Sequence, residues 1–278
     1  MIKFVYRVAS LRIHISGGRR RISNQILREE NIFSEMFFPK EIGINAGKRA
    51  VSRLNSKQAQ TGNFPIIFDS RVSRSIANHI ASSINGSSVA RGTSMFQDQM
   101  NSKILNSSIS VVDDPKFYRG HGSVPFDSEG LPTVKREIIS NGILNGWLLD
   151  LSSAKQLELK PTGNAKRRIG GPASPGTSNF MILSGKETPE SIRSDIKSGL
   201  LITQLIGSSV NLISGNYSRG ASGFWIENGE LTNSVSEITI AGNLKDMFLN
   251  LTAANDLDKS HSIMSPTLRV ESMMVAGN

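Results

Sequence analysis

The chain has 278 residues, of which 38% are hydrophobic and 20% are charged, a composition typical of a globular protein and not of a disordered or fibrous one. This length is sufficient for one large domain or two small ones. The sequence contains no cysteine, which excludes disulfides, thiolate metal ligands and a cysteine nucleophile. A reducing, cytoplasmic location fits this composition. No apolar run approaches about 18 residues, so a membrane-spanning helix is not expected.

The net charge of +9 is unevenly distributed. Residues 1–40 hold eight Lys or Arg against three Asp or Glu, whereas residues 41–278 hold 24 against 20. This basic leader is expected to be a disordered terminus or the ragged start of a shortened chain. It lacks the apolar region and cleavage site of a secretion signal. Its arginine run at 19–21 has no interleaved aromatic residues that would stack on bases, so nucleic-acid binding is only an alternative hypothesis.

The first regular pattern begins at residue 64. Phe64–Phe68 predicts a buried strand, and residues 71–85 predict a helix with apolar residues at every fourth position from 72 to 84. Asp69 or Ser70 is expected to cap the start of this helix. We expect Asn85-Gly86 to end it, because both residues tolerate the left-handed backbone of a helix C-cap.

Two hairpins follow a short strand predicted at residues 109–112. Strands at 133–140 and 143–150 flank Asn141-Gly142, and strands at 223–227 and 230–240 flank Asn228-Gly229. Asn-Gly supplies the two positive φ angles of a type I′ turn, so each pair of strands must be antiparallel. The predicted fold class is therefore α+β, with predominantly antiparallel sheets and a few short flanking helices.

The remaining predicted elements are short. Helices are expected at residues 152–158, 189–197 and 244–251, the second started by Thr188 and Pro189. The Gly- and Pro-rich stretch 160–179 indicates a mobile surface loop, and residues 266–276 indicate a closing strand.

Catalytic motifs are absent from the sequence. None of the four histidines, His14, His79, His121 and His261, has a second histidine at a spacing suited to zinc. There is no serine-nucleophile elbow and no complete phosphate-binding glycine loop. The acidic pairs at 113–114 and at 256 and 258 are interpreted as turn residues. The residues alone therefore predict no metal site and no catalytic apparatus.

Several long strings nevertheless resemble a known family. They lie at residues 91–94, 125–130, 152–155, 215–230, 235–247 and 275–278. These strings are similar to the PmbA/TldE branch of the TldD/PmbA metallopeptidase family, and the similarity covers about residues 41–278. The resulting domain division is an unmatched leader, 1–40, followed by a PmbA/TldE-like central and C-terminal region, 41–278.

The resemblance implies a subunit of a heterodimeric zinc peptidase that acts on small unfolded peptides, including microcin-type precursors and antitoxins. In the TldD member, a helical H-E-x-x-x-H motif and a cysteine hold the metal. Alignment on residues 91–94 places Ala77 and Ser82 at the two histidines and Asn78 at the glutamate. Alanine has no lone pair, a serine hydroxyl is a poor zinc ligand, and asparagine is no general base. The resemblance thus implies a non-catalytic chain with no cofactor of its own, whose TldD-type partner carries zinc.

Four residues in the matched region are candidate contacts for peptide or partner: Tyr217, Arg219, Phe224 and Trp225. Their aromatic rings would equally serve as hairpin core, and Arg219 would equally satisfy backbone carbonyls. Family members carry a sizeable N-terminal domain, so the chain is expected to be truncated. Two alternatives stay open: a peptidase of the same family that is active alone through an unrecognised site, and a non-functional remnant.

Overall fold

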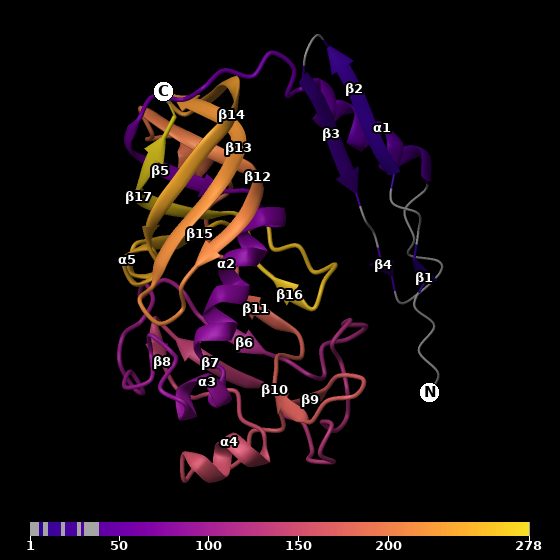
Figure 1. Ribbon diagram of the computed structural model, residues 1–278, viewed down its shortest axis with the longest axis vertical. Helices are drawn as coiled ribbons and strands as arrows, with labels where there is room; N and C mark the ends of the chain where they lie inside the picture. Colours follow the sequence, from indigo (N-terminus) through magenta and orange to yellow (C-terminus); the bar gives the residue numbers. More distant parts are fainter. Residues whose placement is uncertain (1–5, 8–10, 18–19, 27–28, 31–38, 278) are drawn as a thin grey trace.

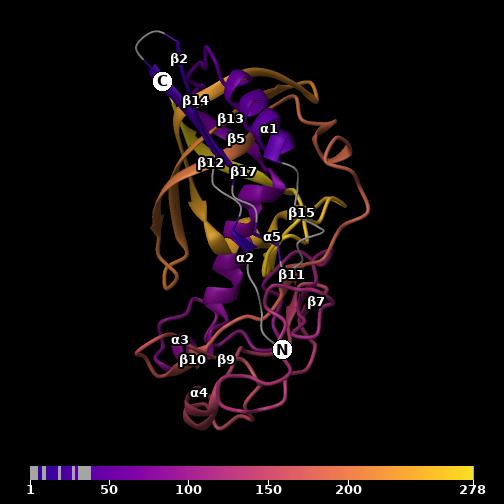
Figure 2. The ribbon, with the colours of Figure 1, turned by 90° about the vertical axis from the view of Figure 1, so that its right-hand side faces the viewer.

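The computed structural model describes residues 6–7, 11–17, 20–26, 29–30 and 39–277. Two β-sheets lie one above the other in Figure 1, and a long helix passes from one to the other. Figure 2, turned by 90°, shows the same succession, with the closed sheet above, the helix in the middle and the second sheet below. The α+β fold class with predominantly antiparallel sheets is confirmed.

The larger sheet closes on itself. Its strands follow the order β14-β13-β12-β5-β17, and β14 also pairs with β17. All of these pairings are antiparallel except that of β5 with β12. A short strand, β15, pairs with another part of β17. The bounds are β5 Gly62–Phe68, β12 Ser198–Val210, β13 Asn216–Glu227, β14 Glu230–Asn243, β15 Leu251–Ala253 and β17 Leu268–Ala276.

The turn that joins β13 and β14 has the predicted conformation. Asn228 and Gly229 have φ angles of 49° and 80°, as a type I′ turn requires. Both strands are longer than predicted, and β13 begins seven residues earlier, at Asn216. The predicted closing strand is also confirmed, as β17.

The smaller sheet has the order β16-β11-β6-β7-β8, in which only β11 and β16 are parallel. Asn141 and Gly142 join β7 to β8 with φ angles of 48° and 81°, so the second predicted hairpin is confirmed, with shorter strands. The bounds are β6 Val111–Asp113, β7 Arg136–Ser140, β8 Ile143–Leu144, β11 Phe180–Ile182 and β16 Ile263–Met264.

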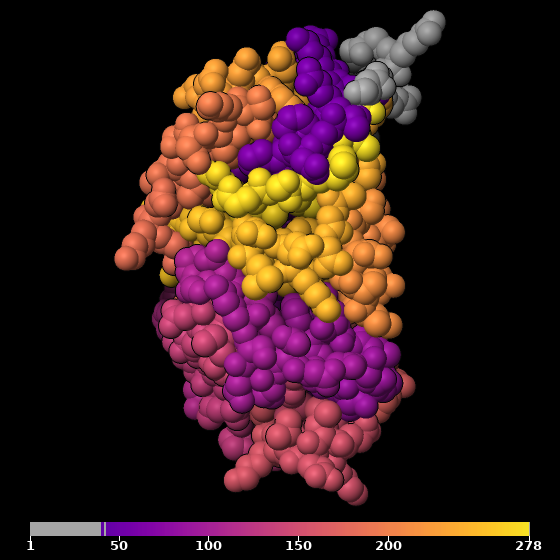
Figure 3. All heavy atoms as spheres, turned by 90° about the vertical axis from the view of Figure 1, so that its left-hand side faces the viewer, coloured from indigo at the N-terminus to yellow at the C-terminus, as the bar shows by residue number. Residues whose placement is uncertain are grey.

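The helix between the sheets is α2, Ser70–Ser83. Its Ile76, Ile80 and the following Ile84 are fully buried in one core shared with both sheets, which confirms the predicted apolar stripe. Burial of each such side chain contributes about 1.5–3 kcal/mol. Figure 3 shows the late segments, in orange and yellow, above the magenta middle segments on one continuous face.

The prediction of a left-handed C-cap at Asn85-Gly86 is wrong. Asn85 has φ −69° and caps the next helix, α3 Gly86–Ala90, through its side chain. Gly86 is required for a different reason, because a Cβ there would lie 2.4 Å from Leu149 Cδ2 and 2.7 Å from the Leu148 carbonyl oxygen. Glycine is therefore required here by close packing and not by a left-handed backbone.

Two further predictions need correction. The stretch 160–179 is not a simple loop, since β9 Ala165–Arg167 and β10 Ala173–Pro175 form a hairpin and Asn164, Ser178 and Asn179 are buried. The helix predicted at residues 189–197 is only a 3-10 turn, η2 Ser191–Arg193. The Thr188 hydroxyl still accepts from the Ser191 backbone N–H at 3.2 Å, but Gly199 enters the closed sheet too soon afterwards for a longer helix.

The other two predicted helices are present. They are α4 Leu151–Gln156, which Asp150 and Ser153 begin with reciprocal capping hydrogen bonds, and α5 Leu244–Leu249. Among the residues that the structure describes, none of the helices combines the length and the apolar character that crossing a bilayer requires.

Much of the basic leader, residues 1–40, lies outside the described residues, so its predicted disorder stays a prediction. Within the described part, β2 pairs with β3 and β1 with β4, both antiparallel, and α1 contacts β2 and β3. The bounds are β1 Tyr6–Arg7, β2 Leu11–Gly17, β3 Arg20–Ile26, β4 Glu29–Glu30 and α1 Pro39–Val51.

Candidate functional site

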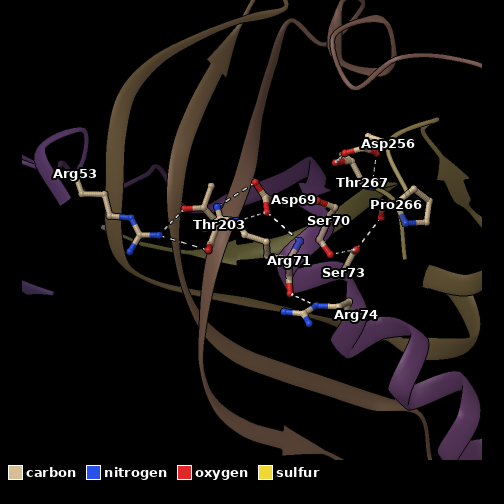
Figure 4. Close-up of polar contacts among 10 residues, drawn as sticks. All are labelled: Arg53, Asp69, Ser70, Arg71, Ser73, Arg74, Thr203, Asp256, Pro266 and Thr267. Atoms are coloured by element: carbon tan, nitrogen blue, oxygen red, sulfur yellow. Dashed lines mark hydrogen bonds and ion pairs between the residues drawn. The ribbon is translucent and has the colours of Figure 1, made fainter. Parts of the chain in front are cut away.

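The candidate site is built on α2, whose first turn is firmly anchored. Asp69 caps it as predicted, and its carboxylate accepts from the backbone N–H of Arg71 at 3.0 Å and from Nε and Nη2 of the same arginine at 2.7 and 3.1 Å. The buried Ser73 hydroxyl donates to the Pro266 carbonyl at 2.7 Å. Figure 4 shows these contacts, which fix α2 to the segment that leads into β17.

Next to this turn lies an arginine that the sequence did not single out. Arg53 donates to Thr203 Oγ1 at 2.9 Å and to Gln204 Oε1 at 2.5 Å (Figure 4 shows the threonine contact). Burial, followed by the charges of Arg71 and Arg49, lowers the pKa of Arg53, and Asp69 opposes this. No sequence signal reveals the group, because its members are some 150 residues apart.

The three positions aligned with the family's metal-binding motif lie in the second half of α2. Ala77 is fully buried in the core, the next residue Asn78 is exposed, and Ser82 is partly buried. Successive helical residues project about 100° apart, so the side chains of Ala77 and Asn78 face different surroundings. Neither alanine nor an exposed amide offers a zinc ligand, and these residues therefore do not fit the ion. In the described ranges, no group of three or more His, Asp or Glu side chains is arranged to hold a metal.

His79, the next residue on α2, faces β13. Its ring lies edge-on to the ring of Tyr217, with 5.9 Å between centroids and an interplanar angle of 80°. Burial, assisted by the positive charge of Arg219, lowers the pKa of His79 to about 4. The imidazole is therefore neutral at physiological pH.

Tyr217 and Arg219 project from the same face of β13, because alternate residues of a strand share a face. Tyr217 is 2% exposed, and burial raises its pKa to about 12 against the opposing charge of Arg219. Arg219 is partly exposed and donates from Nε to the Gly207 carbonyl at 2.8 Å. The structure thus brings these two candidates together with His79.

Phe224 and Trp225 lie near the other end of β13, so the four candidates do not form one site. Tyr217 and Trp225 are eight residues apart on the strand, or about 26 Å at the usual rise. The Trp225 ring packs edge-on against Phe64 at 5.1 Å and also lines an open cavity of about 310 Å³. The tryptophan is therefore partly a packing residue, and Phe224 is partly exposed beside it.

The interpretation of Asp113 as a turn residue is wrong, because its carboxylate is buried. Asp113 lies in β6, is 2% exposed, and accepts from the Ser178 backbone N–H at 2.7 Å and from Asn164 Nδ2 at 2.8 Å. Burial outweighs these hydrogen bonds and raises the pKa of Asp113. Asp114, by contrast, accepts from the Lys116 backbone N–H as a turn residue does. The role of Asp113 is to hold the 160–179 segment against the smaller sheet.

Comparison with known proteins places the chain in a family. A model of the PmbA/TldA metallopeptidase C-terminal domain matches residues 61–277. The chain is 36% identical over 273 residues to the metalloprotease PmbA of Escherichia coli O157:H7, a match that covers 93% of the chain and 59% of that protein. The chain therefore belongs to the PmbA/TldA metallopeptidase family, and the resemblance noted in the sequence is confirmed.

Solved structures agree with this assignment. A Bacteroides thetaiotaomicron protein described as a proposed modulator of DNA gyrase matches with a TM-score of 0.88 at 29% identity, covering 97% of this chain and 59% of that one. TldE from Thermococcus kodakarensis matches with a TM-score of 0.83 at 25% identity, covering 96% and 62%. The chain spans about three fifths of the length of these relatives.

Proposed function

We propose that this chain is the non-catalytic subunit of a cytoplasmic TldD/TldE-type metallopeptidase assembly that processes or degrades small unfolded peptides. One observation carries the proposal: where the family's catalytic motif would fall, α2 presents a buried methyl group at Ala77 and an exposed amide at Asn78. Hydrolysis by a zinc enzyme needs at least three protein ligands and a base near the bound water. These side chains provide neither.

The anchoring of α2 supports a retained structural role. Its N-terminus is capped by Asp69, joined to the C-terminal segment through Ser73, and its apolar face fills the shared core. A subunit that binds a partner must keep such a scaffold even without catalytic ligands. Zinc, on this proposal, is held by the TldD-type partner, and this chain contributes surface for the partner and the peptide.

The proposal is tested by co-expression with a TldD-type protein from the same genome. We expect the two chains to co-purify, zinc to be present at one ion per pair, and peptide cleavage to require both. The chain purified alone is expected to hold no stoichiometric zinc and to cleave no peptide.

Four outcomes would contradict the proposal. Peptidase activity of the rigorously purified chain alone would identify an independent peptidase, and tightly held zinc in this chain would place the metal here. Absence of any association with the partner would favour a non-functional remnant. Steeply salt-dependent DNA binding that depends on residues 1–40 would instead support the nucleic-acid alternative.

A further inference from the structure

Two buried polar atoms between α2 and β13 make no hydrogen bond of good geometry. They are Nε2 of His79 and the hydroxyl of Tyr217. Their rings are in edge-to-face contact, and Tyr217 is 2% exposed. Because an unpaired buried polar group costs desolvation free energy, such groups are uncommon in native structures and their occurrence needs an explanation.

The third member of this cluster is Arg219, which stands two residues after Tyr217 on the same strand face. Its Nε donates to the Gly207 carbonyl, which fixes one side of the guanidinium. The guanidinium also lies close to the Tyr217 hydroxyl, where its charge and hydrogen bonding oppose the rise in the tyrosine pKa. Among the described residues, Arg219 has no carboxylate partner. The cluster therefore combines a phenol O–H, an imidazole and a guanidinium, with no anion to accept from them.

We propose that His79, Tyr217 and Arg219 form a binding site for a peptide carboxylate. The cluster carries one positive charge beside two neutral groups, which suits a monoanion better than a phosphate dianion. A carboxylate has two oxygens with about four acceptor sites, enough for one guanidinium N–H, the tyrosine O–H and the imidazole Nε2–H together. This site deepens the proposed function, on which it rests, by naming the peptide group that the subunit would hold.

Room for the rest of the peptide lies beside the cluster. An open cavity of about 450 Å³ is lined by residues 208–211 and 216–218, which include Tyr217. Arg219 and His79 are both partly exposed, and rotation of the Arg219 side chain would admit a carboxylate to the two buried atoms. The neighbouring strand segment is exposed from Ile206 to Ser209 and leaves this approach open.

The test is a peptide titration of the isolated full chain, followed by NMR of the histidine ring protons, with His79→Asn identifying the resonance. The probes are acetylated tripeptides that differ only in the acid: a free α-carboxylate, its carboxamide, and the carboxamide with one aspartate. We expect a saturable shift of His79 with a carboxylate-bearing probe and binding weaker by about tenfold or more with the plain carboxamide. The bound anion should also raise the pKa of His79 from about 4, because it neutralises Arg219 and favours the imidazolium.

Variants separate a binding role from a structural one. Arg219→Gln and Tyr217→Phe should each weaken binding of the carboxylate probe by about tenfold while the chain stays folded. Arg193→Gln is the matched control, because Arg193 also donates from Nε to a backbone carbonyl, that of Gly229. This variant should bind the probe as the parent does.

Preference for the α-carboxylate or for aspartate identifies the source of the anion. Equal binding of all three probes, or no effect of Arg219→Gln, overturns the site. The titration uses the isolated chain, so that result would not contradict association with a TldD-type partner. The co-purification experiment tests that association separately.

Discussion

Ile240 of β14 lies opposite Val275 of β17, and this pairing joins the last strand of the chain to the central hairpin. Both side chains are fully buried in the main core. β17 also pairs with β5, so the C-terminal strand completes the closed sheet and removes two free strand edges at once.

The closed sheet predicts that neighbouring residues of β17 differ strongly in their contribution to stability. Val275→Ala should destabilise the chain by about 2 kcal/mol, because it removes buried methyl groups and leaves a cavity. Met274→Ala should cost less than about 0.5 kcal/mol, because Met274 is 45% exposed on the other face. Urea denaturation of both variants measures the difference. Equal losses would mean that the strand does not pack in this register.

The cap of α2 predicts a graded response at Asp69. Asp69→Ala should cost about 1–2 kcal/mol, because the first turn loses the acceptor of the Arg71 backbone N–H. Asp69→Asn keeps an oxygen for this bond and loses only the partly exposed ion pair with Arg71, worth about 0–1 kcal/mol. Thermal unfolding should therefore rank the asparagine variant between the parent and the alanine variant. The reverse order would contradict the capping role.

The lowered pKa of His79 predicts that the free energy of unfolding decreases as the pH becomes acidic. Its pKa is about 4 in the folded chain and about 6.5 in the unfolded chain, so below pH 6.5 the unfolded state takes up a proton that the folded state does not. This contribution is fully present above pH 6.5 and declines as the pH falls toward 4. His79→Phe, which retains a ring against Tyr217, should flatten the profile of unfolding free energy between these values. His121→Phe is the control, and an unchanged slope in His79→Phe would contradict the assignment.

The close packing around Gly86 predicts that an added side chain destabilises the protein by steric overlap. A left-handed backbone at this position would not predict such an overlap. Gly86→Ala should cost about 1–3 kcal/mol, because the new methyl group would overlap Leu149 and the Leu148 carbonyl. Gly146→Ala is a matched control, since nothing lies within 4 Å of a Cβ at that position. Chemical denaturation should separate the two variants clearly. If both are tolerated alike, the contact between α3 and residues 148–149 is looser than described.

The burial of Ala77 predicts that placing the family's ligand residues on α2 does not by itself create a zinc site. Ala77→His should be destabilised by about 1–3 kcal/mol, because the methyl group lies in a filled core. Asn78→Glu should be nearly neutral, because Asn78 is exposed. The triple variant with Ser82→His should still bind zinc poorly in isothermal titration. Tight binding would show that α2 retains the geometry of the family's metal site.

Local patterns were most reliable where short-range chemistry decides the structure. Both Asn-Gly turns, the Asp69 cap and the buried stripe of α2 follow from backbone torsion preferences, a local hydrogen bond and a four-residue period. The sequence also shows that Ala77, Asn78 and Ser82 stand where the family's metal-binding motif would lie, because this depends only on residue type and alignment. Helix length was less reliable, since residues 189–197 form only a single 3-10 turn before β12 begins at Ser198.

The sequence by itself determined the family, the hairpins and the absence of a cysteine ligand, because each depends on residue identity or on spacing over a few positions. Only the tertiary structure decided that β14 meets β17, that Asp113 is buried beneath the 160–179 segment, and that His79 faces Tyr217 and Arg219. These relationships join residues far apart in the chain, 138 positions for His79 with Tyr217 and 35 for Ile240 with Val275. No local preference encodes such a distance, and packing of the two sheets around α2 sets it.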